Sequence, residues 1–335
     1  MAAEGRQTPS LRTDVRSGVS GSLRPPSLRS GGFQMHDSTF QPAFVAVMAF
    51  TDNHFEEALN TLGSLCVARN RAIEESGEGD ASAATSVPSL AVRIYARLGE
   101  REVTRLSTLP WGDVGWRVIG LPAGYVAAGE ADWGTPNFSR IVRAKFHALQ
   151  EEVAAAGSGA AVIWMDTDLY FFSEPCGPLA KEISVQSRAA NPPVGLFQVA
   201  DTPNICTGFF VLPPWKRDLQ REMLAAAARM LEAHVAKIAA ATRLGALRRV
   251  GAKVPYMGDE KAINAVLRGN PSRFPASPLP RFRYVNGRDF FGAHGKPRNI
   301  PATEIPRAIL VHNNWIKGVT NKVGRFKQHG MWIVQ

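Results

Sequence analysis

The chain has 335 residues, of which 45% are hydrophobic and 20% charged, an ordinary composition for a globular protein with one large α/β domain or two small ones. No apolar run reaches 18 residues, no secretory signal is visible at the start, and three scattered cysteines argue against a disulfide framework. The net charge of +10 lies mostly in residues 281–335 and suggests an anionic partner, which could be nucleic acid, a membrane surface or a phosphate-bearing small molecule.

Apolar strand patterns alternate with helical patterns along the chain. Residues 1–40 are rich in Ser, Gly, Pro and Arg, so we expect a disordered tail there and a folded domain over residues 41–335. Strands are predicted at residues 44–50, 90–96, 115–121, 160–165, 194–200, 209–212 and 308–311. Helices are predicted from a cap at residues 51–53 to about residue 69, and at 137–156, 219–244 and 259–267, with a loop at 74–88. This alternation predicts an α/β fold with a parallel or mixed sheet.

The most informative segment is the strand at residues 160–165, which ends in Asp166-Thr167-Asp168. Buried strands seldom carry charge, so two carboxylates at a strand end need a partner. We expect a divalent cation with a phosphate on its far side, because Mg²⁺ and Mn²⁺ prefer a few carboxylates plus substrate oxygens. Ligands of open α/β sheets bind at the carboxyl ends of strands, where these aspartates lie. The plainer alternative is a strand that leaves into a polar turn.

His312 follows the last predicted strand in the same way and precedes a Gly-Lys segment. An imidazole at a strand end suits the role of third metal ligand beside two aspartates, although a lone histidine can equally be a hydrogen-bonded side chain. Gly318 would let the backbone approach a phosphate and Lys322 would neutralise it. The alternative for this segment is a solvated basic turn.

Two further segments suit a ligand rich in hydroxyl groups, such as a sugar. Asn204, Thr207 and Gly208 lead into a strand and could hydrogen-bond to hydroxyls, or could form an ordinary tight turn. Asp259 and Glu260 begin a short helix and could accept hydrogen bonds from sugar hydroxyls, whereas the alternative is that Asp259 only caps the helix.

Taken in order, these motifs resemble the nucleotide-diphospho-sugar transferases of glycosyltransferase family 77, which are relatives of the family 8 enzymes with the GT-A fold. The resemblance covers about Phe44 to Val334. It is carried by Asp166-Thr-Asp168, Thr207-Gly208-Phe-Phe, Gly258-Asp-Glu260 with Asn264, and His312 followed by a Gly-Lys tail and Lys327-Gln-His-Gly-Met-Trp332. It implies a single GT-A domain with a Rossmann-like mixed sheet flanked by helices.

The resemblance also implies an activity, namely retaining transfer of a sugar from a nucleotide diphosphate donor, usually UDP-linked, to a glycan or glycoprotein acceptor with Mn²⁺ or Mg²⁺. It implies metal contacts from Asp166, Asp168 and His312, and catalytic or sugar-facing roles for Asp259 and Glu260. Donor contacts are expected from Lys145, Asn204, Thr207, Gly208, Gly318 and Lys322. Nucleic acid is not an expected partner. The family resemblance implies a Golgi-lumenal or membrane-associated location, although neither a signal nor an anchor is visible in this chain.

The chain departs from the family pattern at two places that face the sugar or the acceptor. Cys206 stands where the family usually has Asn before Thr-Gly, and Glu260 stands where it usually has Gln. We expect Asp259 to face the donor sugar and Glu260 to face the helix end or solvent. The alternatives are a nucleotidyltransferase or phosphatase that uses the same Asp-x-Asp metal site, and a basic nucleic-acid-binding protein, which would leave Asp166 and Asp168 without a role.

Overall fold

A computed structural model describes residues 43–77, 87–125, 136–200, 204–243, 257–293 and 295–334. All of them belong to one compact unit, His36–Gln335. The disordered tail predicted at residues 1–40 lies outside the described residues, as do residues 78–86 of the predicted loop. Within the described ranges, no helix is both long and apolar enough to cross a bilayer.

The main sheet has seven strands in the order β3-β2-β1-β4-β7-β6-β8. Strands β1 to β4 run parallel to one another, whereas β7 is antiparallel to both β4 and β6. The strands are β1 (Phe44–Ala49), β2 (Leu90–Tyr95), β3 (Gly115–Ile119), β4 (Ala161–Met165), β6 (Gly195–Val199), β7 (Ile205–Leu212) and β8 (Ala276–Pro278). The predicted mixed α/β sheet is therefore confirmed.

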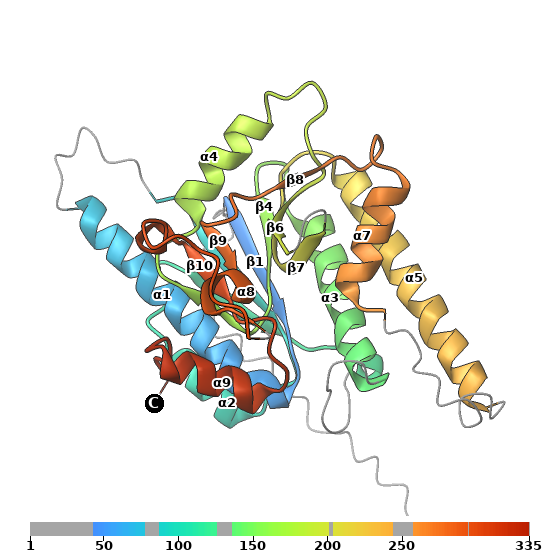
Figure 1. Ribbon diagram of the computed structural model, residues 1–335, viewed down its shortest axis with the longest axis horizontal. Helices are drawn as coiled ribbons and strands as arrows, with labels where there is room; N and C mark the ends of the chain where they lie inside the picture. Colours follow the sequence, from blue (N-terminus) through green and yellow to red (C-terminus); the bar gives the residue numbers. More distant parts are fainter. Residues whose placement is uncertain are drawn as a thin grey trace, which may run out of the picture. The chain divides into compact units, whose positions relative to one another are not determined.

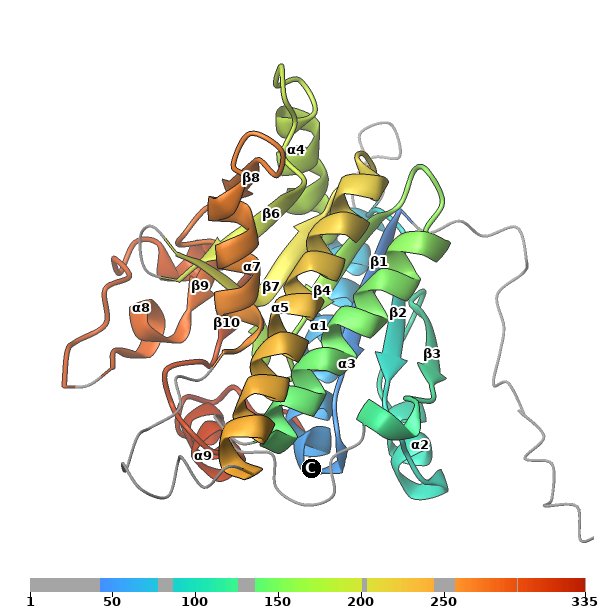
Figure 2. The same ribbon diagram turned by 90° about the vertical axis from the view of Figure 1, so that its right-hand side faces the viewer.

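Helices cover both faces of this sheet (Figures 1 and 2). One face packs on α1 (Phe55–Gly77), α2 (Glu100–Ser107) and α4 (Cys176–Gln186), and the other on α3 (Pro136–Ala155), α5 (Arg217–Arg243) and α7 (Asp259–Gly269). Alternate residues of β1 enter the two cores, Ala46 and Met48 on the α1 side and Val45 and Val47 on the α3 side. A strand buried on both faces must be apolar throughout, which explains its unbroken hydrophobic run.

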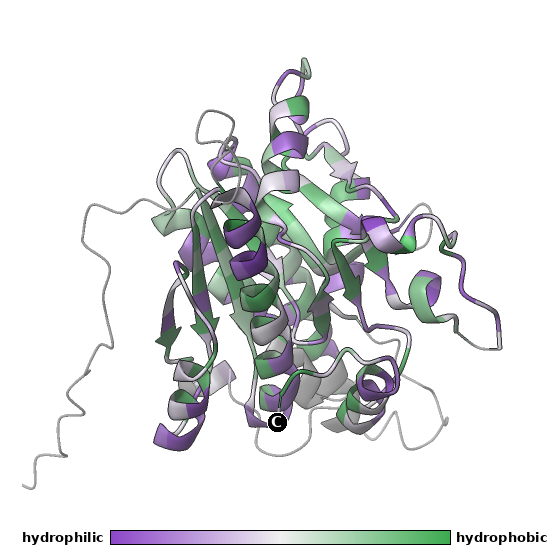
Figure 3. Ribbon diagram, turned by 90° about the vertical axis from the view of Figure 1, so that its left-hand side faces the viewer, coloured by the Kyte–Doolittle hydropathy of each residue, from purple (hydrophilic) through white to green (hydrophobic). Residues whose placement is uncertain are grey.

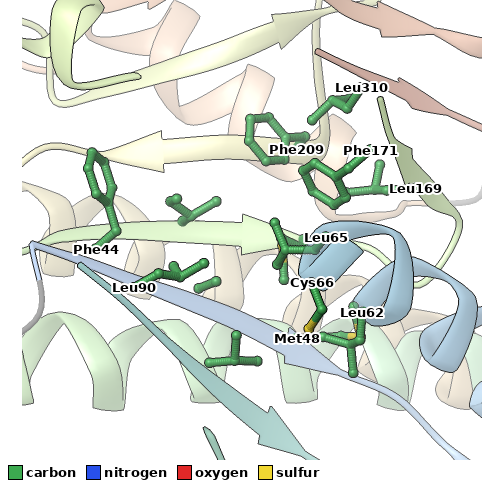
Figure 4. Packing of buried hydrophobic residues seen from close by; sticks show 14 of the residues in the cluster. Phe44, Met48, Leu62, Leu65, Cys66, Leu90, Leu169, Phe171, Phe209 and Leu310 are labelled. Carbon is green, nitrogen blue, oxygen red and sulfur yellow. The ribbon is translucent and has the colours of Figure 1, made fainter. Parts of the chain in front are cut away.

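The core between α1 and the sheet is built from aliphatic and aromatic side chains. Leu62 and Leu65 of α1 belong to one cluster with Met48 of β1, Phe171 and Phe209 (Figure 4). Figure 3 shows hydrophobic residues concentrated in the strands and hydrophilic residues along the covering helices. Burial of this apolar surface is the main favourable term in holding the layers together.

A second, three-stranded sheet lies beside the first, and two of its three strands come from the C-terminal part of the chain. Its order is β5 (Leu169–Phe171), β10 (Leu310–His312) and β9 (Tyr284–Asn286). Strand β10 pairs with β5 antiparallel, with His312 opposite Leu169, so His312 is held next to the segment that follows β4. The short helix α8 (Gly287–Phe291) follows β9, and α9 (Val319–Gln328) follows β10.

Several element boundaries differ from prediction. Helix α1 continues to Gly77, past the expected end near residue 69, because its last turns contain good helix formers such as Arg71, Ala72 and Glu75. Strand β7 begins at Ile205, so Thr207 and Gly208 lie inside a strand and the alternative of a tight turn is wrong. The cap of α7 is Gly258, and Asp259 is the first helical residue, so the prediction of an Asp259 cap is also wrong.

Among the described residues, four α-helices were not expected from the sequence pattern, namely α2, α4, α8 and α9. Helix α4 has Gly177 and Pro178 in its first turn, where a missing backbone N–H costs little because that group has no partner within the helix. Helix α9 contains Gly324 and begins after Gly318, whose φ of 81° lies in the left-handed region that favours glycine. The Gly and Pro residues of both segments favour a prediction of loop, because these residue types usually mark turns.

Candidate functional site

Asp166, Asp168 and His312 converge at the junction of the two sheets. His312 Nε2 lies 3.2 Å from Asp168 Oδ1 and 3.8 Å from Asp166 Oδ2. One potential ligand atom from each of the three residues lies within 4.8 Å of those of the other two. Two carboxylates and an imidazole form a donor set that suits Mn²⁺ or Mg²⁺, so the residues fit a divalent cation.

Two cationic groups surround the buried Asp168 carboxylate. Lys322 Nζ forms an ion pair with Asp168 Oδ2 at 2.8 Å, and His312 lies on the other oxygen. Burial disfavours the charged carboxylate, but Lys322 and His312 outweigh it and hold the pKa of Asp168 well below its usual value. Burial likewise opposes charge on His312, yet Asp168 raises the pKa of His312 well above its usual value. A divalent cation bound here would take over part of this neutralisation.

Gly208 leaves the space in which the His312 ring lies. A Cβ atom added to Gly208 would be 1.9 Å from His312 Cε1, far inside van der Waals contact. The Gly208 carbonyl accepts a hydrogen bond of 2.8 Å from the Asp166 backbone N–H, which fixes the strand end beside the ring. Glycine at this position is thus required by close packing against the histidine.

Lys145 of α3 is a buried ammonium that joins several parts of the site. Its Nζ donates to Asp259 Oδ2 at 2.6 Å, to the Thr207 carbonyl at 2.5 Å and to Asp166 Oδ1 at 3.3 Å. The Nζ also lies 4.6 Å from the centre of the Trp164 ring. Burial opposes its charge, but Asp166 and Asp259 outweigh that effect and raise the pKa of Lys145. Lys145 therefore bridges the carboxylates of Asp166 and Asp259 through its buried ammonium group.

Asp259 and Glu260 differ in their surroundings. Asp259 Oδ2 accepts hydrogen bonds from both Lys145 and Thr207 Oγ1, the latter at 2.6 Å. Burial opposes ionisation of Asp259, but Lys145 holds its pKa below the usual value. Glu260 has no such partner among the described residues, and burial together with the Asp259 charge raises the pKa of Glu260 to about 7. Asp259 is thus engaged by Lys145 and Thr207, whereas Glu260 is affected mainly by burial and by the charges around it, and which of the two faces a sugar stays a prediction.

Two predicted donor contacts, Asn204 and Gly318, are not in this cluster. The Asn204 side-chain oxygen accepts a hydrogen bond from Arg268 near the end of α7. Gly318 precedes α9, and its carbonyl accepts a hydrogen bond of 3.1 Å from the Lys322 backbone N–H. Gly318 thereby sets the start of the helix that carries Lys322 to Asp168.

Three residues at the site were missed by the sequence prediction. Trp164 Nε1 donates to Asp166 Oδ1 at 2.6 Å, and Gln198 Oε1 lies 3.2 Å from His312 Nδ1. Glu57, in the first turn of α1, is fully buried, and Thr167 Oγ1 donates to it at 3.5 Å. For Gln198 the available signal was a polar residue within an apolar segment, the Gly-Leu-Phe-Gln-Val run of β6.

Much of the basic C-terminal segment is engaged within the protein. Arg281 pairs with Asp289 at 2.7 Å, and Arg325 Nη1 donates to the Asn314 carbonyl at 3.1 Å. Lys327 lies over the Trp332 ring. The aromatic residues Tyr284 and Phe326 are buried in the hydrophobic cores.

Comparison with known proteins gives only distant likenesses. No protein-family model and no curated protein sequence matches the chain. Mouse xyloside xylosyltransferase 1 is 13% identical with a TM-score of 0.48, over 81% of this chain and 97% of that one. The galactosyltransferase LgtC, solved with donor and acceptor sugar analogues, is 11% identical with a TM-score of 0.42, over 80% and 86%. The bifunctional glycosyltransferase WbbM is 12% identical with a TM-score of 0.46, over 83% of this chain.

This chain spans only 46% of the length of WbbM. Likenesses at these identities and TM-scores do not bear on donor, acceptor or reaction. Membership of glycosyltransferase family 77 stays a prediction, because no family model matches.

Proposed function

We propose that this protein is a metal-dependent glycosyltransferase that moves a sugar from a UDP-linked donor to a glycan or glycoprotein acceptor with retention of configuration. The convergence of Asp166, Asp168 and His312 at the ends of strands from two sheets supports this most directly. A purely structural cluster would not need two adjacent carboxylates and a histidine around one point, because buried charge is costly.

The residues around the cluster have distinct proposed roles. A bound Mn²⁺ or Mg²⁺ would stabilise the negative charge that develops on the leaving diphosphate. Asp166, Asp168 and His312 would hold that cation, and Lys322, already beside Asp168, would contact the diphosphate. Lys145 would hold the Asp166 carboxylate in position through its ion pair with Oδ1.

We assign Glu260 as the sugar-facing group, in preference to Asp259. Asp259 is hydrogen-bonded to Lys145 and Thr207, so its lone pairs are partly used. Glu260 has a pKa of about 7, raised by burial and by Asp259, and can hold or release a proton near neutral pH. Such a group can accept a hydrogen bond from a sugar hydroxyl or stabilise positive charge on the sugar ring.

The proposal is tested by incubating the protein with Mn²⁺ and a panel of nucleotide sugars, without acceptor, and separating the nucleotides released. We expect release of UDP from one donor and none from the Asp168→Asn variant. Release of UMP would instead indicate cleavage between the phosphates, which is the chemistry of a nucleotidyltransferase or phosphodiesterase. A wild-type protein that releases no nucleotide from any donor, with or without a mixture of glycan acceptors, would contradict the proposed function.

A further inference from the structure

Gln198 of β6 connects the main sheet to the small sheet beneath the site. Its side chain is completely buried. Its Nε2 donates to the carbonyls of Val285 at 2.9 Å and Tyr284 at 3.2 Å, at the start of β9. Its Oε1 lies 3.2 Å from His312 Nδ1. All three contacts cross from β6 to the sheet that carries His312.

These contacts determine which way the amide and the imidazole must be oriented. Backbone carbonyls only accept hydrogen bonds, so the amide nitrogen of Gln198 must face Val285 and Tyr284. The amide oxygen then faces His312, and because that oxygen only accepts, His312 Nδ1 must carry the proton. In neutral His312 the lone pair is consequently on Nε2, the atom that faces Asp166 and Asp168.

We propose that Gln198 is a positioning residue for His312, fixing the ring and its Nδ1–H tautomer so that Nε2 is presented to a divalent cation between Asp166 and Asp168. This proposal rests on the metal-dependent function proposed above. Metal-binding histidines generally donate their other ring N–H to an acceptor that fixes the tautomer. Here the acceptor is an amide that is itself held by two backbone carbonyls.

Cys206 is the competing acceptor on the same side of the ring. Its Sγ lies 3.4 Å from His312 Nδ1 and also receives a 3.6 Å contact from Asn314 Nδ2. Sulfur is a weak acceptor, so the Gln198 oxygen should make the larger contribution to holding the N–H. The two contributions can be separated by mutation because the side chains come from different strands, β6 and β7.

The test compares Mn²⁺ affinity in two leucine variants, using the free Mn²⁺ signal in electron paramagnetic resonance. Gln198→Leu fills the same space but cannot accept, and should bind Mn²⁺ about 10- to 100-fold more weakly. Gln220→Leu is the matched control, because Gln220 is also completely buried and donates to the carbonyls of Val194, Pro213 and Trp215 without touching His312. It should lose stability yet retain wild-type affinity. Cys206→Ala should weaken binding less than Gln198→Leu.

Each failure has a separate meaning. A wild-type protein that binds no Mn²⁺ would overturn the metal-dependent function and this inference together. Wild-type binding with unchanged affinity in folded Gln198→Leu, or a larger loss in Cys206→Ala, would overturn the positioning role alone. If Gln198→Leu does not fold, the positioning role is tested in the wild-type protein with diamagnetic Zn²⁺, by using nitrogen NMR to determine which ring nitrogen of His312 is protonated. We expect a protonated Nδ1 on His312, identified by its loss in His312→Gln, and a protonated Nε2 would overturn the role.

Discussion

At the scale of single residues, the site depends on close packing around the His312 ring. The ring has Asp168 on one edge, Gln198 and Cys206 on the other, and the Gly208 backbone against its side. A ring held on every side keeps its nitrogen atoms in fixed positions, which is what a metal ligand requires. Small changes of volume here should therefore affect ion binding more than they affect the fold.

Gly208→Ala tests this packing directly. The added Cβ would lie 1.9 Å from His312 Cε1, so the ring must move. We expect Mn²⁺ binding to be lost, while circular dichroism shows a folded protein. Gly159→Ala is the matched control, since a Cβ there would meet nothing within 4 Å, and it should bind Mn²⁺ like the wild type. Normal Mn²⁺ affinity in Gly208→Ala would contradict the assignment of His312 as a ligand.

Glu57 is a buried carboxyl group that holds its proton at neutral pH. Burial, with the nearby Asp168 and Asp166 charges, raises its pKa from the usual 4.5 to about 8 despite the attraction of Lys322. Because the folded-state pKa is higher than the unfolded one, the folded form binds more protons between these values. The contribution of Glu57 to stability is thus complete below pH 4.5 and is lost as the pH rises towards 8.

Glu57→Gln should remove this pH dependence, because glutamine is neutral at every pH. We expect the free energy of unfolding in urea, measured with chelator present, to fall between pH 5 and pH 8 in the wild type and to fall less in the variant. Glu56→Gln is the control, since the bond to Arg105 holds the pKa of Glu56 below its usual value and its contribution is lost only as the pH falls. An equal slope in Glu57→Gln and wild type would refute the assignment.

At the scale of elements, Lys145 joins α3 to β4, β7 and α7. Its ammonium contacts Asp166 after β4, the Thr207 carbonyl in β7 and Asp259 at the start of α7. Removing one partner of a buried charge pair leaves the other charge uncompensated. The relative placement of three elements at the site therefore depends on one side chain.

Lys145→Met should lower the free energy of unfolding by roughly 3–5 kcal/mol, the usual cost of breaking a buried ion pair. Asp259→Asn in the Lys145→Met background should recover part of this loss, because it removes a stranded carboxylate. Arg143→Met on the same helix is the control, since its pair with Glu232 at 3.3 Å is partly exposed and should be worth about 1 kcal/mol or less. Urea denaturation measures all four proteins. A cost for Lys145→Met equal to that of Arg143→Met would contradict this account.

At the scale of the whole molecule, the positive net charge could serve to bind nucleic acid or the diphosphate of a small ligand. The charge of +10 is concentrated in residues 281–335, but several of its groups are engaged internally, by Asp289, by Asp168 and by the Trp332 ring. Such groups cannot release many counterions on binding nucleic acid without first breaking these contacts. One of them, Lys322, lies where a diphosphate would be bound in the proposed function.

Lys322→Ala should therefore weaken UDP binding in the presence of Mn²⁺, measured by calorimetry, because a charge-assisted contact is lost. Lys327→Ala on the same helix is the control and should bind UDP normally, since Lys327 lies over Trp332. Nucleic-acid binding should be unmeasurable at physiological salt. A log–log salt dependence steeper than about −4, together with no UDP binding, would support a nucleic-acid-binding protein instead.

Local sequence was sufficient to predict those elements whose hydrophobic pattern can be recognised without knowing which other elements pack against them. The apolar runs of β1 and β4 identify strands buried on both faces, and the Asp166-Thr167-Asp168 segment stands out because charge at the end of such a strand needs a partner. The position of His312 after another apolar strand was likewise visible in the sequence. These predictions depend only on neighbouring residues.

Only the tertiary structure decided which distant groups meet. Lys145 and Asp259 are 114 positions apart, as are Gln198 and His312, and their contacts follow from strand order and register. Gly208 appeared to belong to a turn, but the pairing of β7 with β4 places it against the histidine. Side-chain periodicity indicates which face of an element is buried and not which partner covers it. The candidate metal ligands could therefore be named from the sequence, but the groups that contact them could not.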